Sequence, residues 1–296
     1  MPEPQAQLAR PDTFERRAAQ ENFPVALRVL PRRVRTHLSA VYAFARLTDD
    51  LGDEGDASPA ERLAALDRLD AGLDAVFAGE PADPPADPVL ARLVPTVRAC
   101  ALPEEPFRRL VEANRIDQRV HRYATWAELR EYCAYSADPV GRLVLAVFGA
   151  STPGREALSD DVCTALQLVE HVQDIGEDFA RGRVYVPAED LDRFGCTDAD
   201  LVGAPASPAL RRVAVFESDR ARVLLRSGAE LVAELSGNAR LAVAGFVAGG
   251  LATLDAFAAA DHDVLSEPRR PARTRVARHV AALLTRARVQ SRSAAA

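Results

Sequence analysis

The stretch Leu166–Pro187 constrains the fold most, because it combines helical spacing with a row of carboxylates. It reads LQLVEHVQDIGEDFARGRVYVP, and apolar side chains cover most of the helix outside its polar row. That polar row, at three- and four-residue steps, consists of Gln167, Glu170, Asp174, Glu177 and Asp178. A helix that is apolar on most sides is buried, and buried acids that lie side by side repel one another unless a cation compensates them. We therefore expect a buried helix whose acids face an internal cavity or a cation.

Another acid row, the first in chain order, lies in His37–Glu54, where Asp49 and Asp53 are four residues apart on another apolar helix; the row in Leu166–Pro187 is the second in chain order. Tyr42 and Arg46 fall on the same helical face as these two acids. Carboxylates suit hard cations, and Mg²⁺ binds through one or two of them together with water and substrate phosphates. Two facing rows therefore predict a Mg²⁺ cluster that handles a diphosphate. The alternative for either row alone is an exposed acidic helix face.

Helix-forming residues dominate the chain, and no segment alternates apolar and polar residues as a strand would. With 296 residues, 48% of them hydrophobic, the chain can bury a large core. The two Gly/Pro-rich breaks, at residues 78–88 and 203–208, are typical of surface loops. The sequence predicts one all-α domain over residues 1–296, with a loosely ordered N-terminus at 1–20 and an arginine-rich C-terminal helix or tail at 268–296.

Cysteine and histidine patterns argue against thiol and transition-metal chemistry. The four cysteines form no C-x-x-C pair and the five histidines no H-E-x-x-H spacing, and scattered thiols suit a reducing compartment. The start of the chain lacks an apolar signal region, and the longest apolar run, Leu241–Leu254, is shorter than the ~20 residues of a membrane span. We therefore expect a cytoplasmic protein, soluble or peripheral on the inner membrane face.

Positive charge is concentrated at the C-terminus. The whole chain has a net charge of −6, yet residues 268–296 contain eight arginines and no acid, which leaves −14 on the rest. A basic segment of this kind can attract an anionic membrane surface. The alternative is a solvated last helix that packs on the body through apolar residues at core-facing spacing, namely Val276, Val280, Leu283 and Leu284. No motif typical of nucleic-acid binding accompanies the arginines, so we expect no nucleic-acid partner.

Local signals predict several helix limits. Ser58 and Glu61 form a capping-box pattern with proline between them, and Thr125 and Glu128 form another. Pro139, two residues before a glycine, predicts a kink or break.

Three further segments follow from the same rules. Residues 159–161 (Ser-Asp-Asp) are expected to cap the helix that carries the second acid row. Pro103–Tyr123 and Leu210–Leu235 are expected to be single helices, the first carrying the polar groups Asn114, Asp117 and His121.

With these residues identified, the chain resembles the squalene/phytoene synthase family of head-to-head isoprenoid synthases. The resemblance runs from about Glu21 to beyond Leu265 and rests on VYAFARLTDDLGDE, YCAYSADPVGRLVL and LQLVEHVQDIGEDFARGRVYVP in this order. The segment ENFPVALRVLP and the Asp-Pro-Val-Gly step are most similar to the hydroxysqualene synthase branch. That branch serves bacterial squalene and hopanoid formation alongside a presqualene diphosphate synthase and a flavin-dependent reductase, which are the functional partners it implies.

The resemblance implies an isoprenoid-synthase helical bundle around a central hydrophobic cavity. It implies Mg²⁺ as cofactor, held mainly by Asp49, Asp53, Asp174 and Asp178, with Asp50 and Glu177 as secondary acids. Arg46 and Arg183 match diphosphate-binding positions. The residues that match the catalytic cavity positions are Tyr42, Tyr132, Gln167 and Tyr185.

Two positions depart from the family pattern, and both lie beside the expected metal site. Glu170 stands where relatives often have Asn, and Gln173 where they often have Arg, so the grip on diphosphate is expected to differ from that of the two-step enzymes. The resemblance implies ionisation of presqualene diphosphate, rearrangement of the carbocation and capture by water to give hydroxysqualene. The alternatives are presqualene diphosphate synthase or phytoene synthase chemistry and, more remotely, a non-catalytic helical scaffold.

Overall fold

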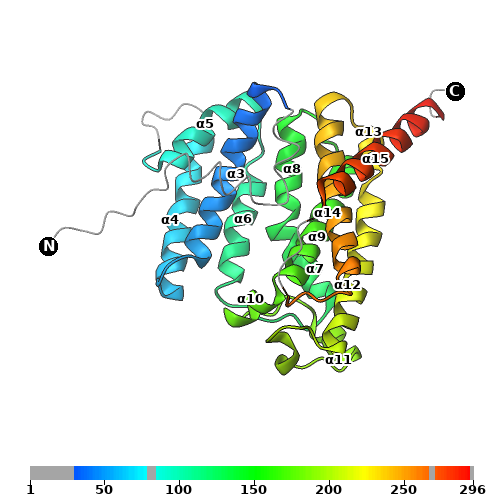
Figure 1. Ribbon diagram of the computed structural model, residues 1–296. Helices are drawn as coiled ribbons and strands as arrows, with labels where there is room; N and C mark the ends of the chain where they lie inside the picture. Colours follow the sequence, from blue (N-terminus) through cyan, green and yellow to red (C-terminus); the bar gives the residue numbers. More distant parts are fainter. Residues whose placement is uncertain (1–29, 79–84, 267–270, 294–296) are drawn as a thin grey trace.

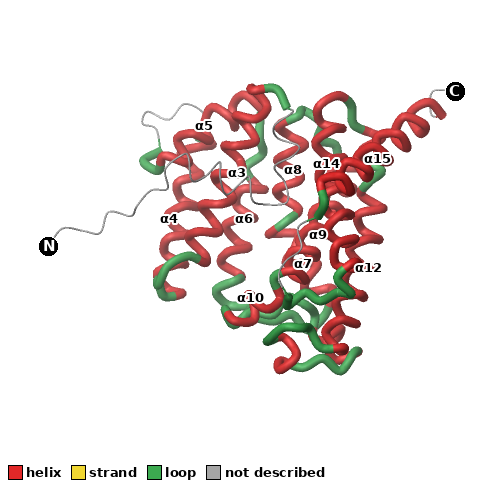
Figure 2. Tube along the Cα trace, viewed as in Figure 1, coloured by secondary structure: helices red, strands yellow, loops and turns green. Residues whose placement is uncertain are grey.

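The computed structural model describes residues 30–78, 85–266 and 271–293, and these residues form helices with no strand among them (Figure 2). The all-α prediction is confirmed. The expected loose segment 1–20 lies outside the described residues. The helices of the first half are α3 (Arg32–Asp53), α4 (Pro59–Phe77), α5 (Pro88–Cys100), α6 (Glu105–Ile116), α7 (Trp126–Ser136) and α8 (Asp138–Val147). Those of the second half are α9 (Pro153–Gln173), α10 (Ile175–Ala180), α11 (Ala188–Arg193), the 3₁₀ turn η1 (Asp198–Leu201), α12 (Pro208–Gly228), α13 (Leu231–Glu234), α14 (Gly237–Ala259) and α15 (Arg273–Ser293).

Helices α3 to α6 pack side by side at the N-terminal side of the molecule (Figure 1). Their apolar faces meet in a core around Phe44, Leu66 and Phe107, each with no exposed surface. The two phenylalanine rings stack edge to face at 5.1 Å, an arrangement that adds to the stabilisation from burial. The first acid row therefore lies on a helix that a packed core holds in place.

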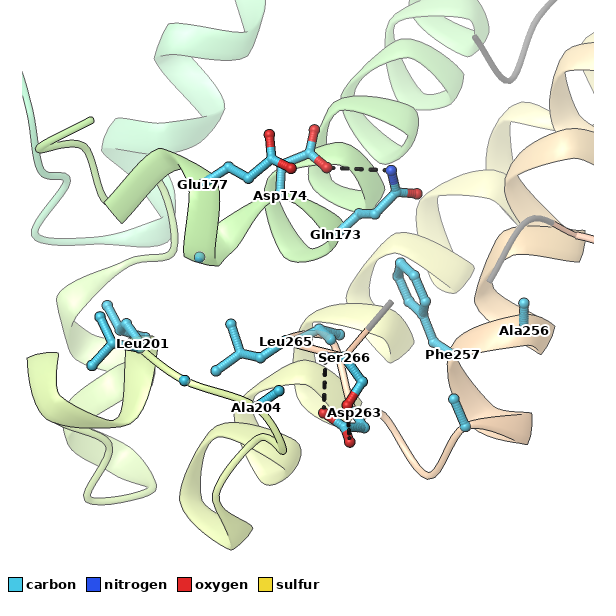
Figure 3. A pocket seen from close by; sticks show the side chains of 15 residues that line it. Gln173, Asp174, Glu177, Leu201, Ala204, Ala256, Phe257, Asp263, Leu265 and Ser266 are labelled. Atoms are coloured by element: carbon cyan, nitrogen blue, oxygen red, sulfur yellow. Dashed lines mark hydrogen bonds between the residues drawn. The ribbon is translucent and has the colours of Figure 1, made fainter. Parts of the chain in front are cut away.

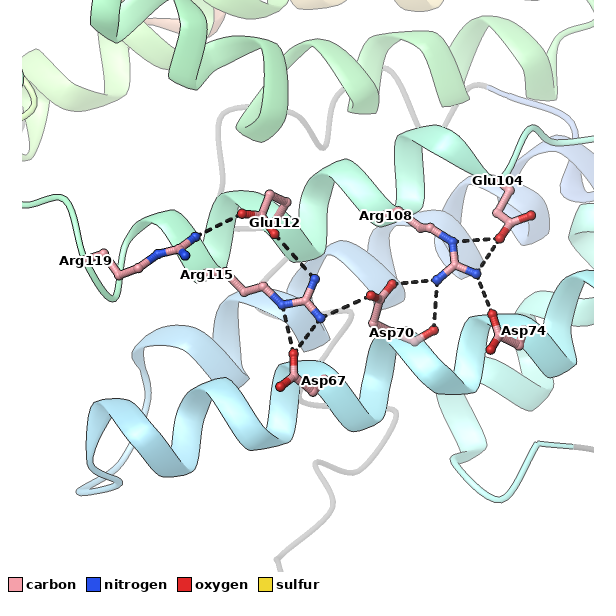
Figure 4. A network of polar contacts seen from close by, with 8 residues as sticks. All are labelled: Asp67, Asp70, Asp74, Glu104, Arg108, Glu112, Arg115 and Arg119. Atoms are coloured by element: carbon pink, nitrogen blue, oxygen red, sulfur yellow. Dashed lines mark hydrogen bonds and ion pairs between the residues drawn. The ribbon is translucent and has the colours of Figure 1, made fainter.

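Ion pairs on the outer side tie α4 to α6 (Figure 4). Arg115 lies 2.7 Å from Asp67, and Arg108 lies 2.8 Å from Asp70. Exposed pairs contribute little singly, but a network of several charges fixes the register of the two helices more firmly than one pair would. The predicted start of α4 is also confirmed, because Ser58 and Glu61 form the reciprocal capping box.

Helices α7 to α9 and α12 to α15 build the other side of the molecule (Figure 1). Helix α9, which carries the second acid row, runs along α12 and also contacts α8 and α14. Gly228 and Gly250 allow these neighbours to approach α9, since a Cβ at either position would overlap side chains of α9. Helix α9 is therefore enclosed by helices, as its apolar circumference predicts.

The break predicted near Pro139 is present. Helix α7 ends at Ser136, and α8 begins at Asp138 with the proline in its first turn. Gly141 has a different role from the one that the sequence suggests, because it lies inside α8 and a Cβ there would overlap Ser159 and Cys163 of α9. The glycine therefore serves close packing of α8 on α9.

Three predicted helix limits are wrong. Helix α9 begins at Pro153 with Thr152 as its cap, so residues 159–161 lie inside the helix, where Asp160 pairs with Arg142 of α8 at 2.8 Å. Helix α6 ends at Ile116 instead of reaching Tyr123. The expected helix Leu210–Leu235 is divided after Gly228 into α12 and α13. At residues 159–161 a tertiary ion pair overrides the local capping signal.

Helices α14 and α15 form the C-terminal part of the bundle. Among the described residues, α14 is the one helix long and apolar enough to cross a membrane, but most of it is buried in the core. Helix α15 packs on the same core through Leu283, Leu284 and Ala287. The prediction of an arginine-rich last helix that packs on the body is thus confirmed for residues 273–293.

Candidate functional site

The first acid row occupies the last turns of α3. Arg46 lies 2.7 Å from Asp50 and 3.2 Å from Glu54, so these two acids partly neutralise it. Asp49, one helical step away, accepts a hydrogen bond from the Asn114 side chain of α6 at 3.3 Å. Gly52 makes this approach of α6 possible, because a Cβ at position 52 would overlap the Asn114 side-chain oxygen.

The second acid row is interrupted at Asp174. Helix α9 ends at Gln173, and the chain continues as the short helix α10, which carries Glu177 and Asp178. The Gln173 amide donates to Asp174 at 3.2 Å. The sequence predicted one continuous helix here. Asp174 and Glu177, whose carboxylates lie side by side, are among the residues that line a pocket of about 420 Å³ (Figure 3). Its lining also includes the apolar residues Leu201, Phe257 and Leu265 and the polar residues Asp263 and Ser266.

The two rows approach each other at Arg183, because both Arg183 and Asp53 lie within electrostatic reach of Asp178. Its guanidinium lies 2.7 Å from Asp53 of α3 and donates a long hydrogen bond of 3.5 Å to the Asp117 carbonyl. The segment that carries Arg183 is held in place because Val184 donates its N–H to the His121 carbonyl at 2.8 Å. Residues 130 positions apart in the chain are therefore joined at the site.

Negative charge at the site exceeds the cations that compensate it. Burial, with a smaller contribution from the charge of Asp53, raises the pKa of Asp49 and that of Asp117 to about 6. Burial, followed by the charge of Asp174, raises the pKa of Asp178 to about 7. Asp49 is exposed at the surface, but the protein that surrounds it still reduces the hydration of its carboxylate. Carboxylates that are harder to ionise than usual indicate a place where an added cation would be stabilised.

The donor set fits a hard divalent cation. All the acids of the two rows offer carboxylate oxygens, and Mg²⁺ needs only one or two of them per ion when water and phosphate complete its shell. Within the described part of the chain, no three His, Cys, Asp or Glu side chains converge on one point.

A cluster of aromatic rings borders the acid rows. Tyr132 and Tyr185 both donate their hydroxyl protons to Asp117, at 2.7 and 3.1 Å. The His171 ring stacks on the Tyr185 ring with 3.9 Å between centroids, and the side-chain nitrogen of Gln167 lies 3.3 Å from His171 Nε2. Burial lowers the pKa of His171 to about 3, so this ring is neutral. Three of the four residues expected in the cavity are therefore brought together.

Tyr42, the fourth of these residues, lies on α3 within electrostatic reach of Arg46. Four buried residues of the site were not selected from the sequence as functional: Asn114, Asp117, Tyr123 and His171. Asn114 and Asp117 are three residues apart at the end of an amphipathic helix, and this helical spacing, which also marks the two rows, could have identified them. Tyr123 and His171 carry no such signal, because their place depends on tertiary packing.

The fold and the acid rows define the class of all-α isoprenoid synthases. A squalene synthase from Alicyclobacillus acidocaldarius superposes with a TM-score of 0.75 at 43% sequence identity, over 85% of this chain and 94% of that one. A dehydrosqualene synthase structure superposes with a TM-score of 0.82 at 23% identity, over 94% of this chain and 96% of that one, which shows the fold.

Sequence comparison narrows this class to one family. The chain belongs to the squalene/phytoene synthase family, whose sequence profile matches residues 16–278. It is 36% identical to a hydroxysqualene synthase of Sinorhizobium fredii, over 73% of this chain and 72% of that one. It is also 33% identical to a phytoene synthase of Mycobacterium tuberculosis, over 74% of this chain and 71% of that one. The family resemblance stated from the motifs is thus confirmed.

Proposed function

We propose that the protein converts presqualene diphosphate to hydroxysqualene with Mg²⁺ as cofactor. The observation that carries the proposal is the approach of two acid rows at Arg183, beside a buried tyrosine cluster. Relatives at 36 and 37% identity named hydroxysqualene synthase support the choice of reaction. The reaction needs three things of a site: a grip on diphosphate, shelter for a carbocation, and one water molecule admitted for its capture.

The acid rows supply the grip on diphosphate. Asp49, Asp53, Asp174 and Asp178 would hold Mg²⁺, with Asp50 and Glu177 as secondary acids. Bound Mg²⁺ neutralises the diphosphate and so favours breakage of its bond to carbon. Arg183 lies at the junction of the rows, where exchange of its Asp53 partner for a phosphate oxygen keeps its charge paired. Arg46 would contribute positive charge from α3.

The aromatic cluster supplies the shelter for the carbocation. Departure of diphosphate leaves a cyclopropylcarbinyl cation, which rearranges before water adds to it. Ring faces carry partial negative charge and stabilise a nearby cation, and apolar walls keep out water that would capture the cation early. Tyr132, Tyr185 and Gln167 would surround the reacting carbons, with Tyr42 on the α3 side.

Substitution of the principal acids tests the metal assignment. We expect Asp49→Ala or Asp174→Ala to lower turnover by about 100-fold or more, because each removes a ligand for a cation that the leaving group needs. Circular dichroism should show unchanged helix content. Asp67→Ala on α4 removes an exposed acid far from the rows and should leave turnover unchanged. Full activity in either row variant would contradict the assignment.

Condensation of two prenyl diphosphates is the second candidate, and the similarity to phytoene synthases favours it. Purified protein with Mg²⁺ is incubated with presqualene diphosphate and, separately, with farnesyl diphosphate and geranylgeranyl diphosphate, and the extracted lipids are identified by mass. Hydroxysqualene from the first alone is the expected result. Presqualene diphosphate from farnesyl diphosphate, or phytoene from geranylgeranyl diphosphate, would replace the proposed reaction with the condensation.

A further inference from the structure

Asp117 occupies an unusual position between the acid rows and the tyrosine cluster. It is the C-cap residue that follows α6, is 6% exposed, and uses one carboxylate oxygen for each of two phenols. Its carbonyl also receives the long hydrogen bond from Arg183, the residue at which the rows approach each other. No exposed acid could hold two phenols in this way against competition from water.

The direction of these hydrogen bonds fixes what the two phenols can do. A tyrosine hydroxyl has one proton to donate and can otherwise only accept. Because Tyr132 and Tyr185 both donate that proton to Asp117, each phenolic oxygen can act only as a hydrogen-bond acceptor toward a further partner. Burial, and then the charge of Asp117, raises the pKa of both phenols well above the usual value, so both keep the proton that they donate.

The rings are held in place, so that both phenolic oxygens stay beside Asp117. His171 stacks on Tyr185, and Tyr123 lies 5.4 Å from Tyr132 and 6.0 Å from Tyr185 between ring centroids. The Tyr123 hydroxyl is buried and has no hydrogen-bond partner within the described structure. A buried hydroxyl without a partner is costly, and a small polar molecule bound there would relieve that cost.

We infer that Asp117 is a positioning residue that turns Tyr132 and Tyr185 into paired acceptors for the water molecule that captures the carbocation. This inference rests on the proposed function, which requires one such water. The water donates to the phenolic oxygens, and its own lone pair forms the new carbon–oxygen bond. The proton lost from the resulting oxonium passes to a phenolic oxygen as that phenol's proton passes to Asp117. The carboxyl group then returns the proton to solvent or to the released diphosphate.

Asp117→Asn tests the inference at nearly constant volume. An amide accepts through one oxygen only and presents N–H to the other phenol, and it cannot take up a proton. We expect turnover of presqualene diphosphate to fall about 100- to 10,000-fold, the usual range for loss of proton-transfer catalysis, while KM changes little. The hydroxysqualene share of the products should fall in favour of unrearranged alcohol and elimination products. The control is Asp160→Asn, which removes a carboxylate of α9 that pairs with Arg142 of α8. This variant should leave the product ratio unchanged.

A double-mutant cycle separates positioning from a general structural effect. In the Tyr132→Phe/Tyr185→Phe background, Asp117→Asn should have little further effect on the product ratio, because the residues act as one unit. Additive effects, or a single variant with wild-type turnover and product ratio, would overturn the inference and leave the proposed function intact. Wild-type protein that forms no hydroxysqualene from presqualene diphosphate would overturn both. If Asp117→Asn fails to fold, the two tyrosine variants measured singly must each shift the product ratio, and unchanged ratios would overturn the inference.

Discussion

At the scale of single residues, Glu217 is a buried acid that shares one guanidinium with a second buried acid. Glu217 and Asp190 are 1% and 2% exposed, and Arg220 lies 2.7 Å from the first and 2.8 Å from the second. The Arg220 guanidinium also lies over the Trp126 ring, which fixes it from a third side. One cation cannot fully compensate two buried carboxylates, and burial, with Asp190 nearby, raises the pKa of Glu217 to about 8 despite the charge of Arg220.

This arrangement predicts that stability falls with rising pH. Glu217 has a pKa of about 8 in the folded protein against an ordinary value of 4.5, so between these values the folded state holds a proton that the unfolded chain has lost. Its contribution is complete below pH 4.5 and declines as pH rises to 8, by at most about 1.4 kcal/mol per pH unit. Glu217→Gln mimics the protonated acid and cannot titrate. Urea unfolding from pH 5 to 8.5 should show the variant gaining stability relative to wild type, whereas parallel pH profiles would contradict the prediction.

At the scale of elements, the close approach of α3 and α6 depends on Gly52. A methyl group there would overlap the Asn114 side chain, which donates to Asp49. We expect Gly52→Ala to destabilise the fold by about 1–3 kcal/mol, the usual cost of overpacking, and to raise the Mg²⁺ concentration needed for activity because Asp49 loses its partner. Gly154→Ala, in the first turn of α9 with open space around it, should change stability by only about 0.5 kcal/mol. A Gly52→Ala protein with wild-type stability and Mg²⁺ dependence would show that Asn114 adapts freely.

Elements whose limits depend on neighbouring residues in the chain could be predicted from the sequence, and those that depend on long-range contacts could not. The start of α4 and the division of α7 from α8 were predictable, because Ser58, Glu61 and Pro139 act within a few residues of themselves. Residues 159–161 were wrongly predicted to cap a helix, because Asp160 pairs with Arg142 of α8 instead of capping its own helix. The acid rows were visible as helical periodicity, but the Arg183–Asp53 pair and the role of Asp117 depend on the bridge between Arg122 and Val184. Such long-range contacts leave no local pattern.

At the scale of the whole molecule, α15 closes the C-terminal side of the bundle. Asp255 of α14 is the anchor: it lies 2.9 Å from His279 of α15 and 3.3 Å from Arg222 of α12. Burial alone would raise the pKa of Asp255, but the hydrogen bonds and charges of His279 and Arg222 lower it. Three helices therefore meet at one half-buried carboxylate, and the apolar contacts of Leu283, Leu284 and Ala287 continue the same interface.

The arginines of α15 divide into those that dock the helix and those that face solvent. Arg275 donates to the Asp255 carbonyl at 3.0 Å, whereas Arg278, Arg286 and Arg288 are exposed. We expect Asp255→Asn to destabilise the protein by about 1–3 kcal/mol, because His279 and Arg222 lose a shared charged partner. Replacement of the three exposed arginines by glutamine should change stability by only about 0.5 kcal/mol. Urea unfolding of both variants measures the difference, and the reverse order of effects would mean that surface charge, rather than the Asp255 anchor, keeps α15 on the bundle.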